Sequence, residues 1–213
     1  MSGSHVHAGQ PVQRAGMSVD RATAVVVMIH GRNAAPANIL SLVPRLDRPG
    51  VAYLAPAAAE RSWYPYTFLS ERHRNEPHLS SALQVLTDIT DDLRERGIAR
   101  DRIVLLGFSQ GACLASEFLL RHPDHWGGLV AFSGGLIGPP GTTWTPSGSL
   151  DGTAVFLGCS DVDAHIPLDR VEDTARVLTE MSADVRLQIY PGMGHAVNDD
   201  EIGQARDLID RLG

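Results

Sequence analysis

The sequence of 213 residues lacks several features that would place it in other classes of protein. It has only two cysteines, Cys113 and Cys159, which are too few for a disulfide framework and are expected to be reduced, packed side chains. No apolar run is long enough to cross a membrane, and residues 1–20 contain no apolar stretch of the kind that a signal peptide requires. We therefore expect a cytoplasmic protein that does not associate with membranes.

Positive charge is also scarce. The chain carries 18 basic and 25 acidic side chains, which give a net charge of −7 with neutral histidines, and its basic residues form no stripe along the sequence. A surface that binds nucleic acid needs such a cluster of positive charge. We therefore expect no nucleic-acid partner.

Apolar residues make up 43% of the chain, which is enough for a full core. Apolar runs alternate with helical periodicity, a pattern typical of an α/β protein with a mostly parallel central sheet and helices on both faces. The runs that predict strands are 24–30, 51–55, 102–108, 127–133, 153–158 and 184–190. Helices are predicted over 36–46 and 76–97, after Pro167 and after Asn198.

The domain organisation follows from the absence of any linker-like segment, which predicts a single domain over 20–213. Residues 1–19 are expected to form a flexible tail, in which the segment from Gln10 to Val12 can add a short edge strand. His5 and His7 lie in this tail with no carboxylate or cysteine beside them, so we do not expect them to bind a metal.

The most informative stretch runs from Gly107 to Gly111 with Ser109 at its centre. It follows the apolar run 103–106 and precedes a helical pattern, which is the context of a nucleophile elbow. A strand that turns sharply into a helix holds the serine in a strained conformation and exposes its hydroxyl, and the small glycines leave room for the turn. Ser109 is therefore the candidate nucleophile.

A serine needs a base and a group that orients the base. Asp163 and His195 each follow a predicted strand, at the edge of a parallel sheet where catalytic groups collect, and the chain order Ser, Asp, His is that of α/β-hydrolases. Asp161 lies two residues before Asp163 and is a second candidate acid, but we expect it to hydrogen-bond amides of its own loop. Together with His165, these residues do not have the spacing of a complete metal site, so no metal or cofactor is expected.

An oxyanion hole requires two backbone N–H groups, one after the nucleophile and one after an early strand. Gln110 supplies the first, and Arg32, which follows the strand 24–30, is the candidate for the second. His30 is a rival for the base, but an imidazole at a strand end commonly supports the turn by hydrogen bonding, which is the role we expect.

Two stretches without periodicity, 56–75 and 134–152, leave strand ends on this edge and are expected to form the walls of a pocket. Neither is long enough for a separate helical lid, so we expect a minimal lid or none and a preference for small or short-acyl esters. The stretches are rich in aromatic residues, some of which are expected to line the site and the rest to pack beneath it. The candidates for substrate binding are Trp63, Tyr64, Phe68 and His165, and the other aromatic residues are Tyr66 and Trp144.

Over about residues 20–210 the chain resembles the phospholipase/carboxylesterase family of α/β-hydrolases, which includes acyl-protein thioesterases, and it is most similar to small bacterial carboxylesterases linked to hydroquinone and aromatic-compound metabolism. The resemblance implies a triad of Ser109, Asp163 and His195 and an oxyanion hole made by the amides of Arg32 and Gln110. The chain departs from the family pattern at Asn33, where a glycine is usual, and at Ala164, where a proline is usual. The motifs that carry the resemblance are His30-Gly31-Arg32, Trp63-Tyr64-Pro65, Asn75-Glu76-Pro77, Gly107 to Ala112, Ser133 to Gly138, Asp163 to Pro167 and Gly192 to His195.

These observations predict a serine carboxylic-ester hydrolase that acts on a small-molecule ester through an acyl-enzyme. Thioester hydrolysis and lactone opening need the same residues and stay open, as does the more remote alternative of a non-catalytic protein that binds small ligands. The guanidinium of Arg32 has two equally supported interpretations, either a grip on a carboxylate of the substrate, with help from His165, or a surface or loop-bracing ion pair. The sequence leaves a homodimer open.

Overall fold

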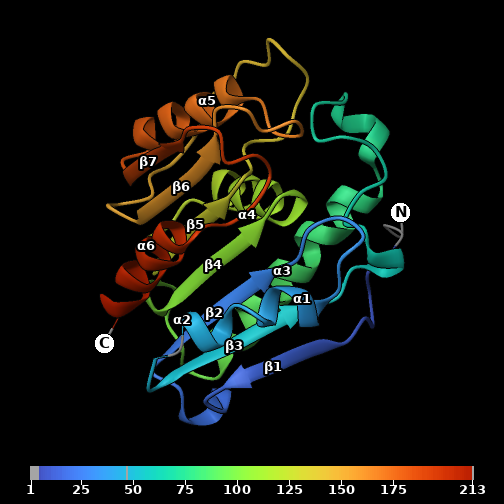
Figure 1. The fold of residues 1–213 in the computed structure, drawn as a ribbon. Coiled ribbons are helices and arrows are strands. Elements are labelled where there is room, and N and C mark those ends of the chain that lie inside the picture. Colours follow the sequence, from blue (N-terminus) through green and yellow to red (C-terminus); the bar gives the residue numbers. More distant parts are fainter. Residues whose placement is uncertain (1–4, 47, 213) are drawn as a thin grey trace.

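Residues 5–46 and 48–212, which the computed structural model describes, form one seven-stranded sheet flanked by helices (Figure 1). The order of the strands is β1-β3-β2-β4-β5-β6-β7, with β1 antiparallel to β3 and every other pair parallel. The prediction of an α/β fold with a mostly parallel sheet is therefore confirmed. The strands are β1 (Val12–Gly16), β2 (Ala24–Ile29), β3 (Val51–Pro56), β4 (Ile103–Phe108), β5 (Gly128–Phe132), β6 (Ala154–Ser160) and β7 (Asp184–Tyr190).

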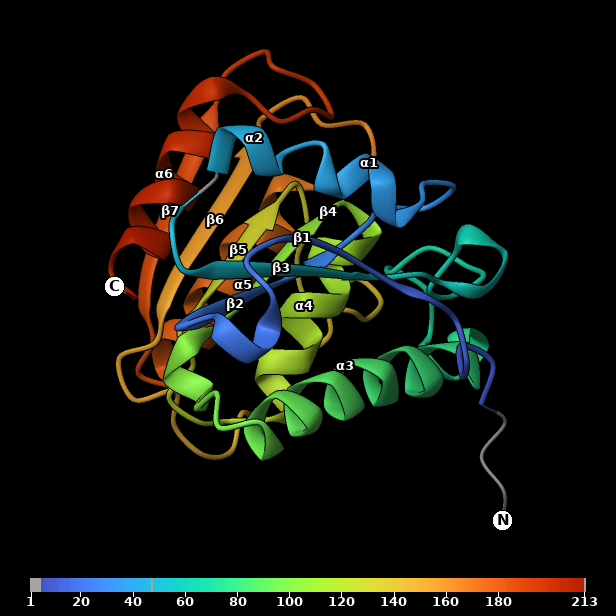
Figure 2. The same cartoon turned by 90° about the horizontal axis from the view of Figure 1, so that it is seen from below.

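Helices cover both faces of the sheet (Figure 2). One face carries α1 (Pro36–Leu40), α2 (Val43–Leu46) and α6 (Asp199–Asp210), and the other carries α3 (His78–Glu95), α4 (Gln110–Arg121) and α5 (Leu168–Glu180). Side chains of a strand point alternately to the two faces, so both halves of the apolar runs in β2 to β6 are buried. In β2, for example, Val25 and Val27 join the core beside α3 and α4, whereas Val26 and Met28 join the core beside α1 and α6.

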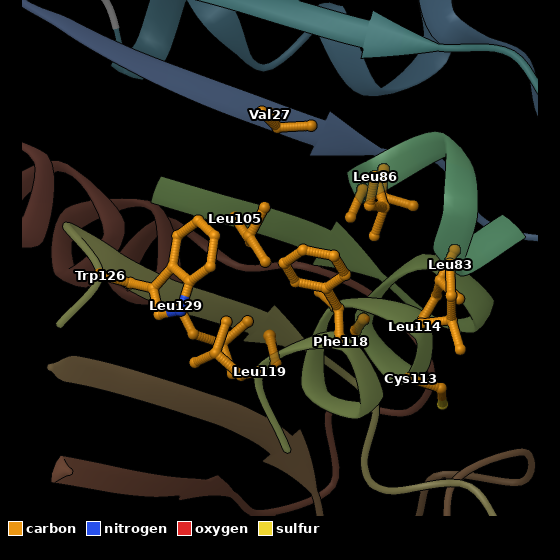
Figure 3. Packing of buried hydrophobic residues seen from close by; sticks show 14 of the residues in the cluster. Val27, Leu83, Leu86, Leu105, Cys113, Leu114, Phe118, Leu119, Trp126 and Leu129 are labelled. Atoms are coloured by element: carbon orange, nitrogen blue, oxygen red, sulfur yellow. The ribbon is translucent and has the colours of Figure 1, made fainter. Parts of the chain in front are cut away.

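Aromatic packing fixes α4 behind the sheet. Figure 3 shows Phe118 of this helix close to Leu105 of β4, and its ring lies 5.5 Å from the ring of Trp126 in an edge-on contact. Both aromatic side chains are almost fully buried, and burial of such large side chains contributes strongly to stability. The N-terminus of α4, which begins directly after Ser109, is thereby held in a fixed place.

The helix predicted over 36–46 is interrupted in the structure, where α1 ends at Leu40 and α2 begins at Val43. Pro44 explains the break, because it has no N–H to donate to the carbonyl of Leu40 and its ring crowds the preceding turn. Helical hydrogen bonding resumes in α2, where the amide of Leu46 donates to the carbonyl of Leu42 at 3.2 Å.

The helix predicted after Asn198 is present as α6 and begins with a reciprocal cap. The side chain of Asn198 accepts from the amide of Glu201, and the carboxylate of Glu201 accepts from the amide of Asn198, each at 2.9 Å. The Glu201 side chain is buried against Gly158, and this burial raises its pKa to about 7.

The N-terminal segment is more firmly attached than a flexible tail, and its strand spans Val12–Gly16 instead of starting at Gln10. His7 is 1% exposed. Its amide donates to Ser81 Oγ at 2.9 Å, its ring Nε2–H donates to the carbonyl of Trp63 at 3.0 Å, and its ring Nδ1 accepts from the amide of Ala59 at 3.0 Å. A single buried imidazole leaves no periodic pattern in a sequence. Residues 1–4 of the predicted tail lie outside the described residues.

Among the described residues, no helix combines the length and the apolar character that a membrane span requires.

Candidate active site

The candidate site lies where the strand order changes direction. From β2 the chain proceeds outward to β3, whereas from β4 it proceeds the other way to β5, β6 and β7. The crevice beyond the carboxyl ends of β2 and β4 is therefore the topological switch point, where open α/β sheets bind their ligands. The loop after β2 carries Arg32, and the turn after β4 carries Ser109.

Ser109 forms the sharp turn between β4 and α4. Its backbone angles are φ 57° and ψ −120°, a strained conformation for a residue other than glycine. The flanking glycines make the turn sterically possible, because a Cβ at Gly111 would lie 2.1 Å from the carbonyl oxygen of Ile29 and one at Gly107 would lie 2.4 Å from the backbone of Gly111. The predicted elbow is therefore present.

The structure brings Ser109, His195 and Asp163 together from three loops. The hydroxyl of Ser109 lies 2.9 Å from Nε2 of His195, and Nδ1 of His195 lies 2.7 Å from Oδ2 of Asp163. An ionised carboxylate only accepts hydrogen bonds, so Nδ1 carries the proton and Nε2 is left to accept from the serine. In this tautomer His195 can take the proton of the hydroxyl.

Asp163 is held in its ionised form. Burial of its side chain acts to raise the pKa, but the hydrogen bond from His195 and two backbone amides outweigh it, so the pKa lies below its ordinary value. The amides belong to His165 and Ile166 and donate to Oδ1 at 2.8 and 3.0 Å. The negative charge therefore faces the imidazole.

Asp161, the rival acid, does not contact His195 but helps to fix the loop that carries His195. Its Oδ1 accepts from the amide of Gly192 at 2.8 Å, and the neighbouring Ser160 hydroxyl accepts from the amide of Gly194 at 3.1 Å. The expectation that Asp161 bonds amides of its own loop is therefore wrong in its partner, because the bond crosses to the loop that carries His195.

Two backbone amides lie beside Ser109 in the same pocket. Gln110 is the first residue of α4, a position whose amide has no acceptor within the helix and lies at the positive end of the helix dipole. The amide of Arg32 likewise has no acceptor among the residues that the structure describes. Both N–H groups are therefore available to a negatively charged oxygen.

His30 supports the turn, as the sequence predicts. It is 1% exposed, its Nδ1–H donates to the carbonyl of Gly31 at 2.8 Å, and its Nε2 accepts from the amide of Ala58 at 3.1 Å. Burial lowers the pKa of this imidazole. Because both ring nitrogens are engaged, His30 has none left for the serine.

The pocket around Ser109 has a volume of about 470 Å³, within the range of sites for small molecules. Tyr64, Phe68 and His165 line it, as expected. Trp63 does not, and this expectation is wrong: its indole is fully buried between the rings of His7 and His30, at 5.5 and 5.1 Å.

Three features of the pocket were not anticipated from the sequence. The side chain of Gln110 accepts from the amide of Trp63 at 2.9 Å and donates to the carbonyl of Tyr64 at 2.8 Å, which joins the 56–75 stretch to α4. The ring of Phe108 lies 4.8 Å from that of His195. For Phe108 the signal was its place inside the elbow motif, whereas nothing in the sequence indicated the role of the Gln110 side chain. The third feature is a set of lining residues that were not predicted to line the site, which are Asn33, Ala34, Thr67 and Ile166.

The stretch 134–152 was expected to form a second wall of the pocket, but none of its residues lines the pocket in the described chain, so this expectation is wrong. Arg170 fixes this stretch. Its buried guanidinium donates to the carbonyls of Leu136 and Gly138 at 2.9 and 2.7 Å and lies 5.0 Å from the ring of Trp144. Trp144 therefore packs beneath the 134–152 stretch instead of lining the site. The two irregular stretches contain no α-helix, in agreement with a minimal lid.

The two thiols are buried and held in the neutral form at neutral pH. Burial raises the pKa of Cys113 and of Cys159 to about 12. Cys113 nevertheless borders the pocket, one helical turn after Ser109. In the described part of the chain, no group of three or more histidine, cysteine, aspartate or glutamate side chains is arranged to hold a metal ion.

The sheet, the elbow and the strand-end loops define an α/β-hydrolase fold. The family model for phospholipase/carboxylesterase matches residues 17–212, and the chain belongs to this family.

Relatives of known structure agree with this assignment. A phospholipase/carboxylesterase from Dyadobacter fermentans is 37% identical and superimposes with a TM-score of 0.89, covering 94% of this chain and 96% of that one. The carboxylesterase of Bacillus cereus has the same fold at 18% identity, with a TM-score of 0.76 over the full length of both chains.

Acyl-protein thioesterase 1 of Eremothecium gossypii is 31% identical over 152 residues, which is 68% of this chain and 61% of the relative. The match to acyl-protein thioesterase 1 of Gibberella zeae is 30% identical over 119 residues, which is 54% of this chain and 50% of the relative. The chain therefore matches less than two thirds of the length of these two proteins.

Proposed function

We propose that the protein is a serine hydrolase that cleaves small or short-acyl carboxylic esters through an acyl-enzyme. The observation that carries the proposal is the hydrogen-bonded chain from Ser109 through His195 to Asp163, with distances of 2.9 and 2.7 Å. Its position at the switch point of the sheet and membership of the phospholipase/carboxylesterase family support the same conclusion.

In the first half of the reaction, the oxygen of Ser109 attacks the carbonyl carbon of the ester while Nε2 of His195 takes its proton. Asp163 holds the imidazole in the required tautomer and stabilises the positive charge that forms on it. The carbonyl oxygen becomes negatively charged and is stabilised by the amides of Arg32 and Gln110. His195 then returns the proton to the departing alcohol.

In the second half, a water molecule gives a proton to His195 and attacks the acyl group on Ser109. The same two amides stabilise the second oxyanion, and collapse of that intermediate breaks the bond to the Ser109 oxygen, to which His195 returns the proton, and releases the acid. Apart from the water molecule, each step uses only side chains and amides of this chain.

Thioester hydrolysis is a second candidate, because the same groups would act on a thioester and two relatives are named acyl-protein thioesterases. The open pocket of about 470 Å³, with no α-helix in the 56–75 stretch that helps to line it, favours small substrates over long-chain acyl groups. Rates for matched oxygen esters, thioesters and lactones, each with acyl groups of two to twelve carbons, distinguish these substrate classes.

The decisive experiment replaces the nucleophile. Ser109→Ala is expected to lower the hydrolysis of 4-nitrophenyl acetate by about 10³-fold or more, and to abolish the mass increase that a fluorophosphonate probe produces on the native protein. The matched control is Ser80→Ala, an exposed serine on α3, which is expected to keep both properties. Retention of hydrolysis within tenfold in folded Ser109→Ala, as judged by circular dichroism, contradicts the proposal.

A further inference from the structure

We propose that the site selects esters that carry a free, anionic carboxylate in addition to the ester group, and that the guanidinium of Arg32 binds this carboxylate. This inference rests on the proposed function. The alternative interpretation of Arg32 as an ion pair is wrong for the described residues, because its guanidinium bonds only backbone carbonyls of the 56–75 stretch and keeps its charge for a substrate.

The side chain of Arg32 is held by the neighbouring 56–75 stretch. Nη1 donates to the carbonyl of Pro65 at 2.8 Å, Nη2 donates to the carbonyl of Tyr66 at 2.6 Å, and the guanidinium carbon lies 5.9 Å from the centre of the Tyr64 ring. The side chain is thus preorganised at the pocket wall, and less conformational entropy is lost when it binds a ligand.

The charge of Arg32 is not neutralised by these contacts, since carbonyl groups carry no net charge. In the described residues, no carboxylate lies within ion-pair distance of this guanidinium, and two of its five N–H groups are used. Nine other arginines of the described chain do form ion pairs with aspartate or glutamate, including Arg72, Arg121 and Arg176.

The pocket itself contains no opposing charge. None of its lining residues in the described chain is aspartate or glutamate, and the carboxylate of Asp163 is enclosed and paired with His195. Although the protein has a net charge of −7, the lining residues of this pocket in the described chain present one fixed positive charge to the substrate, that of Arg32. Arginine recognises carboxylates through paired, charge-assisted hydrogen bonds, which are stronger than those to neutral groups.

The remaining walls indicate the rest of the substrate. Tyr64, Phe68 and Ile166 line the pocket with apolar surface. Such surface suits a short aliphatic or aromatic body between the ester and the carboxylate. The substrate class is therefore an ester with a compact apolar body and one additional carboxylate.

Two matched pairs of substrates test the inference. In the first pair the charge is on the acyl side: mono-4-nitrophenyl glutarate is compared with 4-nitrophenyl valerate, which has a methyl group in place of the carboxylate. In the second it is on the alcohol side: 4-acetoxybenzoate is compared with 4-methylphenyl acetate. The readout is the ratio of kcat/KM for the charged and the neutral member, so effects common to both members cancel.

Arg32→Gln is expected to lower this ratio about tenfold or more in at least one pair, mainly through a higher KM for the charged ester. Arg32→Lys, which keeps the charge without the planar fork, is expected to give an intermediate ratio. The control is Arg74→Gln, since Arg74 is exposed on the same stretch, stacks on Tyr66 and does not line the pocket. It is expected to leave the ratio unchanged.

An unchanged ratio in Arg32→Gln, or equal losses on the charged and neutral esters, overturns the inference and leaves Arg32 as a loop brace. A fall of the same size in Arg74→Gln also overturns it, because the effect would then come from general charge. Failure of the proposed function is recognised separately, because the native protein would then hydrolyse neither pair or would do so without Ser109.

Discussion

Asp161 and Asp163 are identical side chains separated by one residue, and their surroundings give them different roles. Asp163 faces the ring of His195, whereas Asp161 faces the amide of Gly192. A substitution by asparagine preserves the shape of either side chain and removes its charge. The two positions therefore separate an effect on the imidazole from an effect on loop geometry.

We predict that Asp163→Asn lowers kcat for 4-nitrophenyl acetate by about 10³- to 10⁴-fold, because an amide can donate to Nδ1 and so favour the wrong tautomer of His195. Asp161→Asn is expected to retain most of the activity, since the amide oxygen of asparagine can still accept from Gly192. Steady-state kinetics on the two purified variants provide the measurement. The assignment of the acid is wrong if Asp161→Asn is the more severely impaired.

The adjacent residues Trp63 and Tyr64 mark the limit of residue-level prediction. Both are aromatic and lie in one irregular stretch, yet only Tyr64 reaches the pocket. Strand and helix patterns assign side chains to faces, but a loop has no such period. The direction of Trp63 is set by contacts with His7 and His30, which lie 56 and 33 residues away along the chain.

At the scale of elements, strands β2 to β6 were predictable because their apolar runs are buried on both faces, whereas β7 at the edge of the sheet has an alternating sequence and is only partly buried. The elbow was predictable for a related reason, because its glycines lie between a strand and a helix. The break between α1 and α2 was missed since the apolar pattern continues through Pro44, whose effect depends on a missing N–H.

Two glycines in helices provide a matched prediction. Gly111→Ala in α4 would place a methyl group 2.1 Å from the carbonyl oxygen of Ile29, and we expect it to lower the free energy of unfolding by about 1–3 kcal/mol or more. Gly203→Ala in α6 meets no atom within 4 Å, and should raise that free energy by about 0.5–1 kcal/mol. Urea denaturation of both variants measures the difference, and similar effects of the two substitutions contradict the packing described for the elbow.

At the scale of the whole molecule, buried ionisable groups make stability depend on pH in opposite senses. Burial lowers the pKa of His7 and His30, so the unfolded chain takes up these protons more readily, and their contribution to stability is lost as the pH falls below about 6.5. Glu201, with its pKa raised to about 7 from an ordinary 4.5, acts the other way, since its burial becomes more costly as the pH rises through this range.

The contribution of His7 to the pH dependence of stability can be isolated by substitution. His7→Gln keeps a side-chain N–H for the carbonyl of Trp63 and removes the titrating group. We predict that, when the pH is lowered from 7 to 5, the free energy of unfolding of this variant shows a smaller decrease, or a larger increase, than that of the native protein. His73→Gln, at an exposed position, is the control and should leave the pH dependence unchanged. Urea titrations at the two pH values provide the test, and parallel pH profiles for His7→Gln and the native protein contradict the prediction.

At Ser109, whose backbone has φ at 57°, selection for folding stability conflicts with selection for the side-chain hydroxyl. Glycine adopts this region of conformation at little cost, whereas a serine held there stores strain. The most stable protein with this fold would therefore lack the hydroxyl on which the proposed chemistry depends. A design procedure that optimised folding alone would remove that group, and its retention in this chain points to selection for a property other than stability.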